Sequence, residues 1–370
     1  MNANKSKKSH NCNFLFVLTR LLRPFSVLYG RILAVRNWLY DKEIYSVFAP
    51  VQRTISVGNI TVGGTGKTPL IEFLASKLLT GPTSLAQSDT IWPMATLSRG
   101  YGRRTSGFRI ATPSDTAETL GDEPLQLYQK FGQRLVVAVA ERRVLGLQEL
   151  ARLHPDVQLV LLDDAFQHRA VQPGLNILLT DYNRPFYRDH PFPEGRLREG
   201  RHGARRADLI IVTKCPDGLS GADQQKIRAA IEPYKAPDAP VFFAGLRYGE
   251  PRNGMGQVLT TAANRAVVLV SGLANADPLD AYVRQVWNLR AHHRFNDHHE
   301  YTRTEIDQLL GSLPDDAVLM TTEKDWVKLR PLLPADAGER AFYLPIAVQL
   351  LGEEADFWAR IEQAAFLKNS

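Results

Sequence analysis

A glycine-rich loop that carries a lysine stands between a short apolar run and an amphipathic segment. The apolar run is 54–57, the amphipathic segment is 69–78, and the loop reads Thr61-Val62-Gly63-Gly64-Thr65-Gly66-Lys67-Thr68. Its glycines let successive backbone N–H groups turn toward phosphate oxygens, and the following helix adds partial positive charge at its N-terminus. Lys67 would reach the outer phosphates, and the Thr68 hydroxyl would bind Mg²⁺. The pattern predicts a P-loop that binds a nucleotide through residues 61–68, with Lys67 active in catalysis. The simpler alternative is a glycine-rich turn before an ordinary helix.

A second nucleotide-binding signature is an apolar run that ends in two acids. Leu159-Val160-Leu161-Leu162 is followed directly by Asp163 and Asp164. In P-loop proteins an acid at the end of such a strand binds magnesium directly or through water. We therefore predict Asp163 and Asp164 as magnesium ligands together with Thr68. Gln167 and His168 add polar groups to the same crevice and are candidates for substrate binding.

Charged residues follow other apolar runs in a similar way. They belong to the loop Leu97–Arg103, the acidic pair Asp122-Glu123 at a helix start, and the group Glu141-Arg142-Arg143. Open α/β sheets bind ligands at the edge where such residues emerge. Candidates for substrate binding are Arg99, Glu123 and Arg142, although Asp122 and Glu123 could equally be a helix cap. An arginine-rich loop at 184–206, which contains Glu199, fits a phosphorylated acceptor or a solvated basic face.

The remaining pattern is that of alternating strands and helices. Several apolar runs are continuous, which predicts parallel strands buried on both faces. The predicted strands are 53–58, 94–98, 135–140, 157–162, 175–180 and 208–213. Residues 241–248 and 257–261 are typical of a two-stranded ribbon, and a smaller unit follows with helices 277–288 and 303–312 and strands 317–321 and 341–346. The predicted fold is α/β: a P-loop NTPase-like, mostly parallel sheet domain (41–238), a β-ribbon linker (239–262) and a smaller α/β domain (263–370).

The N-terminal 40 residues differ from the rest in charge. They hold seven lysines and arginines and no acid, whereas the whole chain of 370 residues has a formal net charge of +6. This asymmetry indicates one basic segment and argues against a nucleic-acid partner. Arginines interrupt the apolar residues of 13–40, so the segment fits neither a membrane span nor a secretory signal. We predict a basic amphipathic helix, broken near Pro24, that lies on an anionic membrane surface. The alternative is a helix packed on the protein's own core.

Cysteine and histidine placement limits other chemistry. Cys12 and Cys215 are far apart, so a disulfide framework or thiolate zinc site is not expected and a reducing compartment fits. A metal site besides magnesium is conceivable at the histidines His292, His293, His298 and His299, but no thiolate supports it. No obligate protein partner is evident.

Taken together, these motifs resemble one family, the tetraacyldisaccharide 4'-kinases, which phosphorylate the 4'-hydroxyl of the lipid A precursor at the bacterial inner membrane. Thr61, which stands where the general P-loop pattern has its first glycine, is usual in that family. Gly200 departs from it, because proline is expected after Leu197-Arg198-Glu199. The matching segments are 56–69, 97–103, 121–124, 163–169, 197–199, 212–216, 295–299 and 321–325.

The resemblance implies a kinase that uses ATP and Mg²⁺, with a catalytic dyad of Asp122 and His298 and a supporting role for Glu199. It also implies a lipid A disaccharide 1-phosphate substrate and a location at the cytoplasmic face of the inner membrane. From the residues alone, three alternatives stay open: another P-loop phosphotransferase, a GTPase or metallochaperone, and a nonenzymatic membrane adaptor. Against the second, Val62 replaces the lysine of the deviant Walker group, and Pro216 stands where a guanine-reading motif needs aspartate. Because Asp122 and His298 fall in different predicted domains, we expect domain closure to join them.

Overall fold

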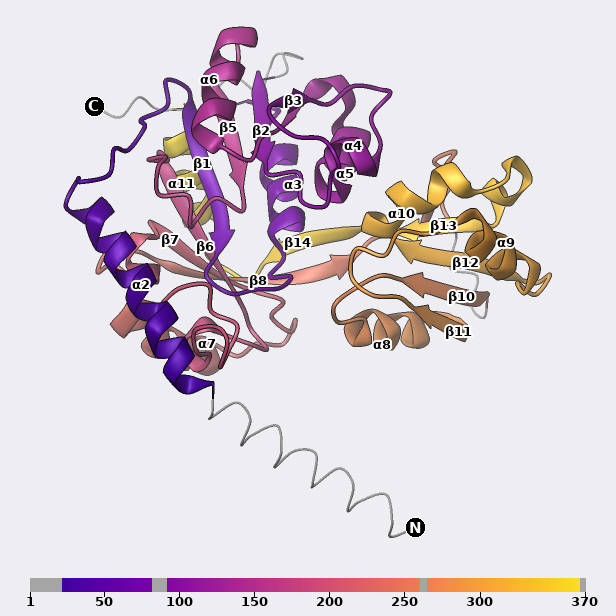
Figure 1. Ribbon diagram of the computed structural model, residues 1–370. Helices are drawn as coiled ribbons and strands as arrows, with labels where there is room; N and C mark the ends of the chain where they lie inside the picture. The colour runs from indigo at the N-terminus through magenta and orange to yellow at the C-terminus, as the bar shows by residue number, and fades with distance from the viewer. Residues whose placement is uncertain (1–21, 82–91, 260–264, 367–370) are drawn as a thin grey trace. The chain divides into compact units, whose positions relative to one another are not determined.

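The computed structural model describes residues 22–81, 92–259 and 265–366, in two compact units (Figure 1). The first unit contains the chain up to Lys67, Leu159–Gly245, and the chain from Leu350 onward. The second contains Thr68–Gln158 and Leu246–Gln349. This grouping by contacts places Asp122 and His298 in the same unit. The domain boundaries given above remain predictions.

A parallel sheet forms the centre of the first unit. Its strands lie in the order β8 (Val241–Tyr248), β7 (Leu209–Thr213), β6 (Leu175–Asp181), β1 (Arg53–Asn59) and β5 (Leu159–Asp163). β1 pairs in parallel with both β5 and β6, and Val57 lies opposite Asp163. Because parallel strands end at a common edge, the loop after β1 and the acids after β5 emerge side by side.

Helices cover both faces of this sheet, as the continuously apolar strands predict. Phe243 belongs to a buried cluster with Ile231 of α7 (Gly221–Ile231), while its neighbour Phe242 makes an edge contact with Phe357 of α11 (Glu354–Phe366). Successive side chains of a strand point to opposite faces, so α7 and α11 cover opposite sides.

The second unit begins with the helix that follows the glycine loop, α3 (Lys67–Leu78). Three neighbouring strands lie in the order β2 (Met94–Ser98), β4 (Val136–Val139) and β3 (Arg109–Ile110), with β2 and β4 parallel. Their connections contain α4 (Ala117–Leu120), α5 (Asp122–Phe131) and α6 (Arg143–Leu153). Asp122 is therefore the first residue of a helix, where the backbone N–H groups favour an anion.

A five-stranded sheet completes the second unit. Its order is β11 (Asn288–Arg294), β10 (Ala266–Ser271), β12 (Ala317–Thr322), β13 (Ala341–Leu344) and β9 (Arg252–Asn253). α9 (Arg303–Gly311) and α10 (Glu323–Leu329) pack with Val268 and Val270, whereas α8 (Asp277–Val286) packs with Val267 and Leu269. Figure 1 shows α8 on one side of this sheet and α9 and α10 on the other.

The fold class predicted from the sequence is confirmed, and the strands expected at 53–58 through 208–213 are all present. Among the longer elements, the helices α7, α10 and α11 and the strand β11 were not expected. The predicted partner strand of the ribbon is wrong, because residues 257–259 form no strand and Val258 makes only an isolated bridge to Arg252. The neighbours of β8 in its sheet are instead β7 and the strand 346–350. Residues 260 and 261 lie outside the described chain. β14 (Ile346–Leu350) follows β13.

The N-terminal segment contains one long helix, α2 (Arg23–Asp41), with Pro24 in its first turn. Residues 13–21 of the predicted amphipathic segment lie outside the described chain. Exposed apolar side chains follow one another at helical spacing along α2, namely Phe25, Leu28, Ile32 and Val35, each 58% exposed or more. None of the helices in the described ranges has the length and apolarity needed to cross a bilayer.

Candidate active site

Hydrogen bonds from the surrounding strands hold the glycine loop in shape. The side-chain amide of Asn59 donates a hydrogen bond to Thr65 Oγ1 at 2.8 Å, and the Thr213 hydroxyl donates one to the Thr65 carbonyl at 2.8 Å. Lys214, which is paired with Asp181 at 2.7 Å, donates to the carbonyl of Gly64. Three carbonyl or hydroxyl groups of the loop are thus turned outward to β1 and β7, which leaves the loop's amides to face the other way.

The backbone amides of the glycine loop fall into two groups, according to whether they donate a hydrogen bond to the described chain. Val62 N–H donates to the carbonyl of Arg196 at 2.7 Å, and Thr61 forms a bridge with Leu197, so this end of the loop is tied to the arginine-rich segment. Within the described chain the amides of 63–66 donate no hydrogen bond. Gly63 and Gly66 have φ of 116° and 85°, which L side chains rarely adopt. Within the loop predicted to bind phosphate, the Val62 amide is thus engaged with Arg196, whereas those of 63–66 are not engaged by the described residues.

Lys67 meets the acidic pair that follows β5. Its Nζ lies 3.5 Å from Asp164 Oδ1, and Arg198 Nη1 contacts both Asp164 oxygens, at 3.0 and 2.9 Å. Burial by itself would raise the pKa of Asp164, but the charges of Lys67 and Arg198 outweigh it and hold the pKa below its ordinary value. Asp163, at the end of β5, is buried. Asp164 is thus an ionised carboxylate that contacts two cations.

The donor set fits magnesium better than a transition metal. Asp163 and Thr68 offer a carboxylate and a hydroxyl, and magnesium takes one or two such oxygens together with water and phosphate oxygens. In residues 22–81, 92–259 and 265–366 no group of three or more His, Cys, Asp or Glu residues could hold a metal ion. His292 instead contacts Asp280 and Ser271, and His299 contacts Glu305, so these histidines are committed to separate partners.

Glu199 is the centre of a polar network in the first unit. This buried carboxylate accepts hydrogen bonds from Gln167 at 3.0 Å, Arg206 at 2.8 Å and Asn37 of α2 at 3.1 Å. Gln167 also donates to the carbonyl of Asn59 at 2.7 Å, at the start of the glycine loop. Through these contacts Glu199 connects α2 with the loop, an arrangement that its position in an arginine-rich stretch did not indicate.

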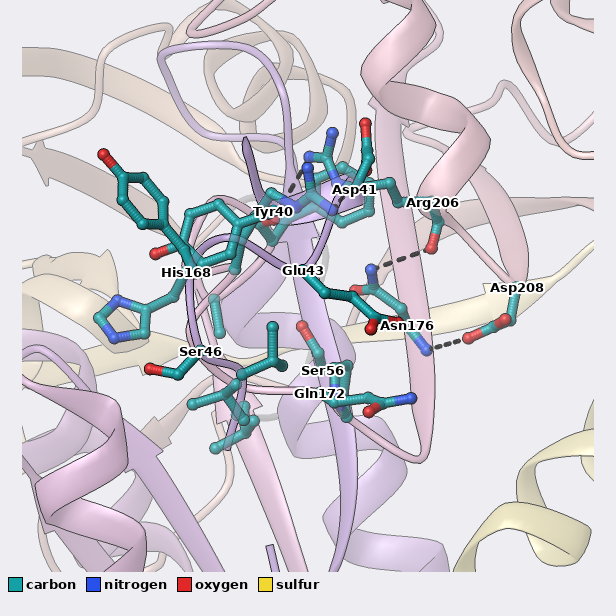
Figure 2. Close-up of a pocket in the computed structure, with 18 residues that line it drawn as sticks. Tyr40, Asp41, Glu43, Ser46, Ser56, His168, Gln172, Asn176, Arg206 and Asp208 are labelled. Atoms are coloured by element: carbon teal, nitrogen blue, oxygen red, sulfur yellow. Dashed lines mark hydrogen bonds and ion pairs between the residues drawn. The ribbon is translucent and has the colours of Figure 1, made fainter. Parts of the chain in front are cut away.

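A cavity of about 740 Å³ lies beside this network (Figure 2). Its walls come from the end of α2 and the segment after it, including Asp41 and Glu43, and from Asn176 and Asp208 near the first residues of β6 and β7. The Asp208 carboxylate accepts a hydrogen bond from the backbone N–H of Asn176 at 2.7 Å. Of the predicted substrate residues only His168 lines the cavity, and no residue of 61–68 does.

The second unit contains the predicted dyad. His298 Nδ1 lies 3.1 Å from Asp122 Oδ2, although the two residues are 176 positions apart. His298 has φ of 60°, an unusual conformation for a non-glycine residue, and Gly121 has φ of 97° directly before Asp122. Such backbone geometry is found where a structure holds a side chain in a required position. The hydrogen bond exists within one compact unit, so no closure is needed to form it.

Two lysines of α10 flank this pair. Lys328 Nζ lies 3.1 Å from Asp122 Oδ2, and Lys324 Nζ lies 3.3 Å from His298 Nε2. Burial would raise the pKa of Asp122, but the His298 hydrogen bond and the Lys328 charge outweigh it and hold the pKa below its ordinary value. Neither lysine was predicted to have a role, although Lys324 lies in the matching segment 321–325. Their spacing of four residues was visible, but the helix that places them on one face was not predicted.

The other residues of the second unit that were predicted to bind substrate lie where loops or helices begin. Arg99 follows β2 and is exposed, Arg142 precedes α6 and is exposed, and Glu123 is the second residue of α5. They remain candidates for substrate binding.

Comparison with known proteins identifies the family. Residues 18–365 match the family model of LpxK, described as tetraacyldisaccharide-1-P 4'-kinase. The chain is 40% identical over 353 residues to the tetraacyldisaccharide 4'-kinase of Cytophaga hutchinsonii, covering 94% of this chain and 96% of that protein. It is 36% identical to the tetraacyldisaccharide 4'-kinase of Bacteroides thetaiotaomicron, with 90% of each chain covered.

A solved structure agrees with these matches. The LpxK of Aquifex aeolicus in complex with ATP has a TM-score of 0.73 and 26% sequence identity, and the match covers 94% of this chain and 100% of that one. The fold, the glycine loop and the full-length similarity lead to one conclusion: the chain belongs to the tetraacyldisaccharide-1-P 4'-kinase family.

Proposed function

We propose that this protein transfers the γ-phosphate of ATP to the 4'-hydroxyl of a tetraacyldisaccharide 1-phosphate, in the biosynthesis of lipid A. The family match over 18–365 supports the reaction. The observation that supports the catalytic assignment is the hydrogen bond between Asp122 and His298, because two distant residues meet through unusual backbone conformations on both sides.

In the proposed reaction the acceptor oxygen attacks the γ-phosphorus while the bond between that phosphorus and the β–γ bridging oxygen breaks and releases ADP. The proton of the acceptor hydroxyl passes to Asp122, which is ionised at neutral pH and can therefore accept it. His298 orients the carboxylate through its Nδ1. Lys67 and the amides of 63–66 bind the phosphates.

Thr68 and the acidic pair Asp163 and Asp164 are the proposed magnesium ligands, and Asp164 also contacts Lys67. When bound, the ion would neutralise charge on the phosphate oxygens. The Lys67 ammonium lies beside an ionised Asp164, so its position is fixed before nucleotide binds.

We further propose that α2 holds the protein on an anionic membrane surface, at the cytoplasmic face of the bacterial inner membrane. Its exposed stripe contains Phe25, Leu28, Ile32, Val35 and Trp38, and Arg23 and Arg31 are exposed on the same helix. Apolar insertion and attraction of arginines to anionic lipid act together in such helices. The contacts of Asn37 to Glu199 and of Tyr29 to the carbonyl of Arg198 secure the opposite side of α2 to the protein.

Transfer of labelled γ-phosphate tests the reaction. With ATP, Mg²⁺ and tetraacyldisaccharide 1-phosphate, we expect label in the lipid and none without the acceptor. Nucleotide hydrolysis that is independent of the acceptor would support a GTPase or metallochaperone, and the absence of any turnover would support an adaptor.

Vesicle binding tests the role of α2. Leu28 and Ile32 are each nearly 60% exposed, so replacing both by serine removes about 2 kcal/mol of membrane burial and weakens binding about 30-fold. Val51→Ser is the control, since Val51 is 92% exposed but lies outside α2. Equal binding of the double variant and the control to phosphatidylglycerol vesicles would remove the membrane role of this stripe.

A further inference from the structure

The helix α10 presents two lysines to the dyad from one face. Lys324 and Lys328 are four residues apart, so their side chains project from neighbouring turns. Lys328 reaches the carboxylate of Asp122 and Lys324 reaches the outer nitrogen of His298. We propose that these lysines are positioning residues of the reaction: Lys328 keeps Asp122 ionised and Lys324 selects the tautomer of His298. This inference rests on the proposed function.

Lys328 is nearly enclosed by protein, and its side chain is 7% exposed. It lies 3.1 Å from the partly buried carboxylate of Asp122 and 3.9 Å from the buried carboxylate of Asp325, with the ring of Tyr301 5.7 Å away. Asp325 is fixed by the Gly272 amide at 2.9 Å and the Thr322 hydroxyl at 2.7 Å. An ammonium in this setting strongly favours the charged form of a neighbouring carboxylate. Without it, His298 alone would oppose the effect of burial, so Asp122 would take up a proton at higher pH than in the wild type.

Both contacts to Asp122 use the same oxygen. His298 Nδ1 and Lys328 Nζ each lie 3.1 Å from Oδ2. Among the described residues no contact is made to Oδ1, so Oδ1 is the oxygen that can face an acceptor hydroxyl. Fixing one oxygen from two directions restricts rotation of the carboxylate, which serves the alignment that proton transfer requires.

Lys324 determines which nitrogen of His298 carries the proton. An ammonium can only donate hydrogen bonds, so a neutral His298 that contacts it must accept at Nε2. The ring proton is then on Nδ1 and points at Asp122. Lys324 is in turn paired with Asp297 at 2.7 Å, which fixes the ammonium beside the ring. The Asp297 carboxylate also lies 3.9 Å from His298 Nε2, and the ring of Tyr101 lies 5.4 Å from that of His298. Further charged or titratable groups near the dyad are Glu123, Tyr301 and Asp325, on α5, the loop before α9, and α10.

The test for Lys328 is the titration of the Asp122 carboxyl carbon by ¹³C NMR in the full-length protein, with the signal assigned by its loss in Asp122→Asn. Lys328→Met keeps the length of the side chain and removes its charge. We expect the titration midpoint to rise by about one to three pH units. The turnover of the variant should fall as the pH is lowered from 7 to 5.5, with little change in KM for ATP.

Lys130→Met is the matched control. Lys130 also joins α5 to α10, through Glu323 at 3.0 Å, but it contacts neither member of the dyad. We expect this variant to lower the melting temperature and to leave the Asp122 midpoint unchanged. An unchanged midpoint in Lys328→Met, or an equal shift in both variants, would overturn the role of Lys328.

Lys324→Met is a second, independent test, because this side chain is 18% exposed and its loss is less damaging to folding. In protein labelled with ¹⁵N-histidine we expect His298 to carry its proton on Nδ1 in the wild type and to gain the Nε2–H form in the variant. Equal tautomer populations would overturn the role of Lys324. A wild-type protein that titrates as expected but labels no lipid would reject the proposed function and leave these contacts as a structural feature.

Discussion

Gly58, near the end of β1, is a position where the structure leaves no room for a side chain. A Cβ built there would lie 2.7 Å from Phe166 Cβ and 2.9 Å from the Phe166 amide nitrogen. Contacts below 3.0 Å require something to shift, and here the neighbours are backbone and Cβ atoms, which cannot rotate away. Gly58→Ala must therefore separate β1 from the segment that follows the acidic pair.

Overpacking of this kind costs about 1–3 kcal/mol, and the backbone contact argues for the upper part of that range. Loss of glycine entropy from the unfolded chain returns about 0.4–1 kcal/mol. We expect a net loss of about 2 kcal/mol in unfolding free energy. Activity should fall as well, because Gln167, next to Phe166, hydrogen-bonds the carbonyl of Asn59, and Asn59 fixes Thr65.

Urea denaturation followed by fluorescence measures the first effect, and phosphate transfer measures the second. Gly200→Ala is the control, since a Cβ at Gly200 meets nothing within 4 Å and its φ is −62°. We expect this variant to match the wild type or to be slightly more stable. A Gly58→Ala protein with the wild-type midpoint and turnover would refute the reasoning, because it would mean that β1 and Phe166 separate without cost.

Three further outcomes are expected. Lys67→Ala should lower turnover at least about 100-fold, the usual effect of losing one charged contact to the transferred phosphate. The melting temperature should stay nearly constant, because Asp164 keeps Arg198 as a partner. A fully active variant would contradict the P-loop assignment. Asp122→Asn and His298→Ala should each lower kcat with little change in ATP affinity. The double variant should be scarcely less active than the less active single variant, because the effects of residues that act as a unit are non-additive. Multiplicative losses in the double variant would show that the two residues act independently. Burial and the charge of Glu323 raise the pKa of Glu72 from 4.5 to about 7, despite the nearby Lys130. The folded protein therefore favours protonated Glu72, so its stabilising contribution is complete below pH 4.5 and is lost as the pH rises through 7; unfolding free energies of Glu72→Gln should lack this decline, and an unchanged pH dependence would contradict it.

Local chemistry explains what the sequence determined by itself. The glycine loop, the acids after an apolar run and the strand positions all depend on residues within a few positions of one another. Backbone freedom, hydrophobic periodicity and charge at a strand end are properties of such short stretches. The pair Asp122 and His298 was reached only through resemblance, since nothing in either stretch points to the other.

Contacts between distant stretches were decided by the tertiary structure. Glu199 was expected to face a substrate, but α2, Gln167 and Arg206 enclose it. Lys324 and Lys328 meet the dyad because α10 packs against α5, and seven residues of helix carry too weak a periodic signal to be predicted. The packing of many elements together sets these distances, so no single stretch of sequence contains the information that places one side chain 3 Å from another.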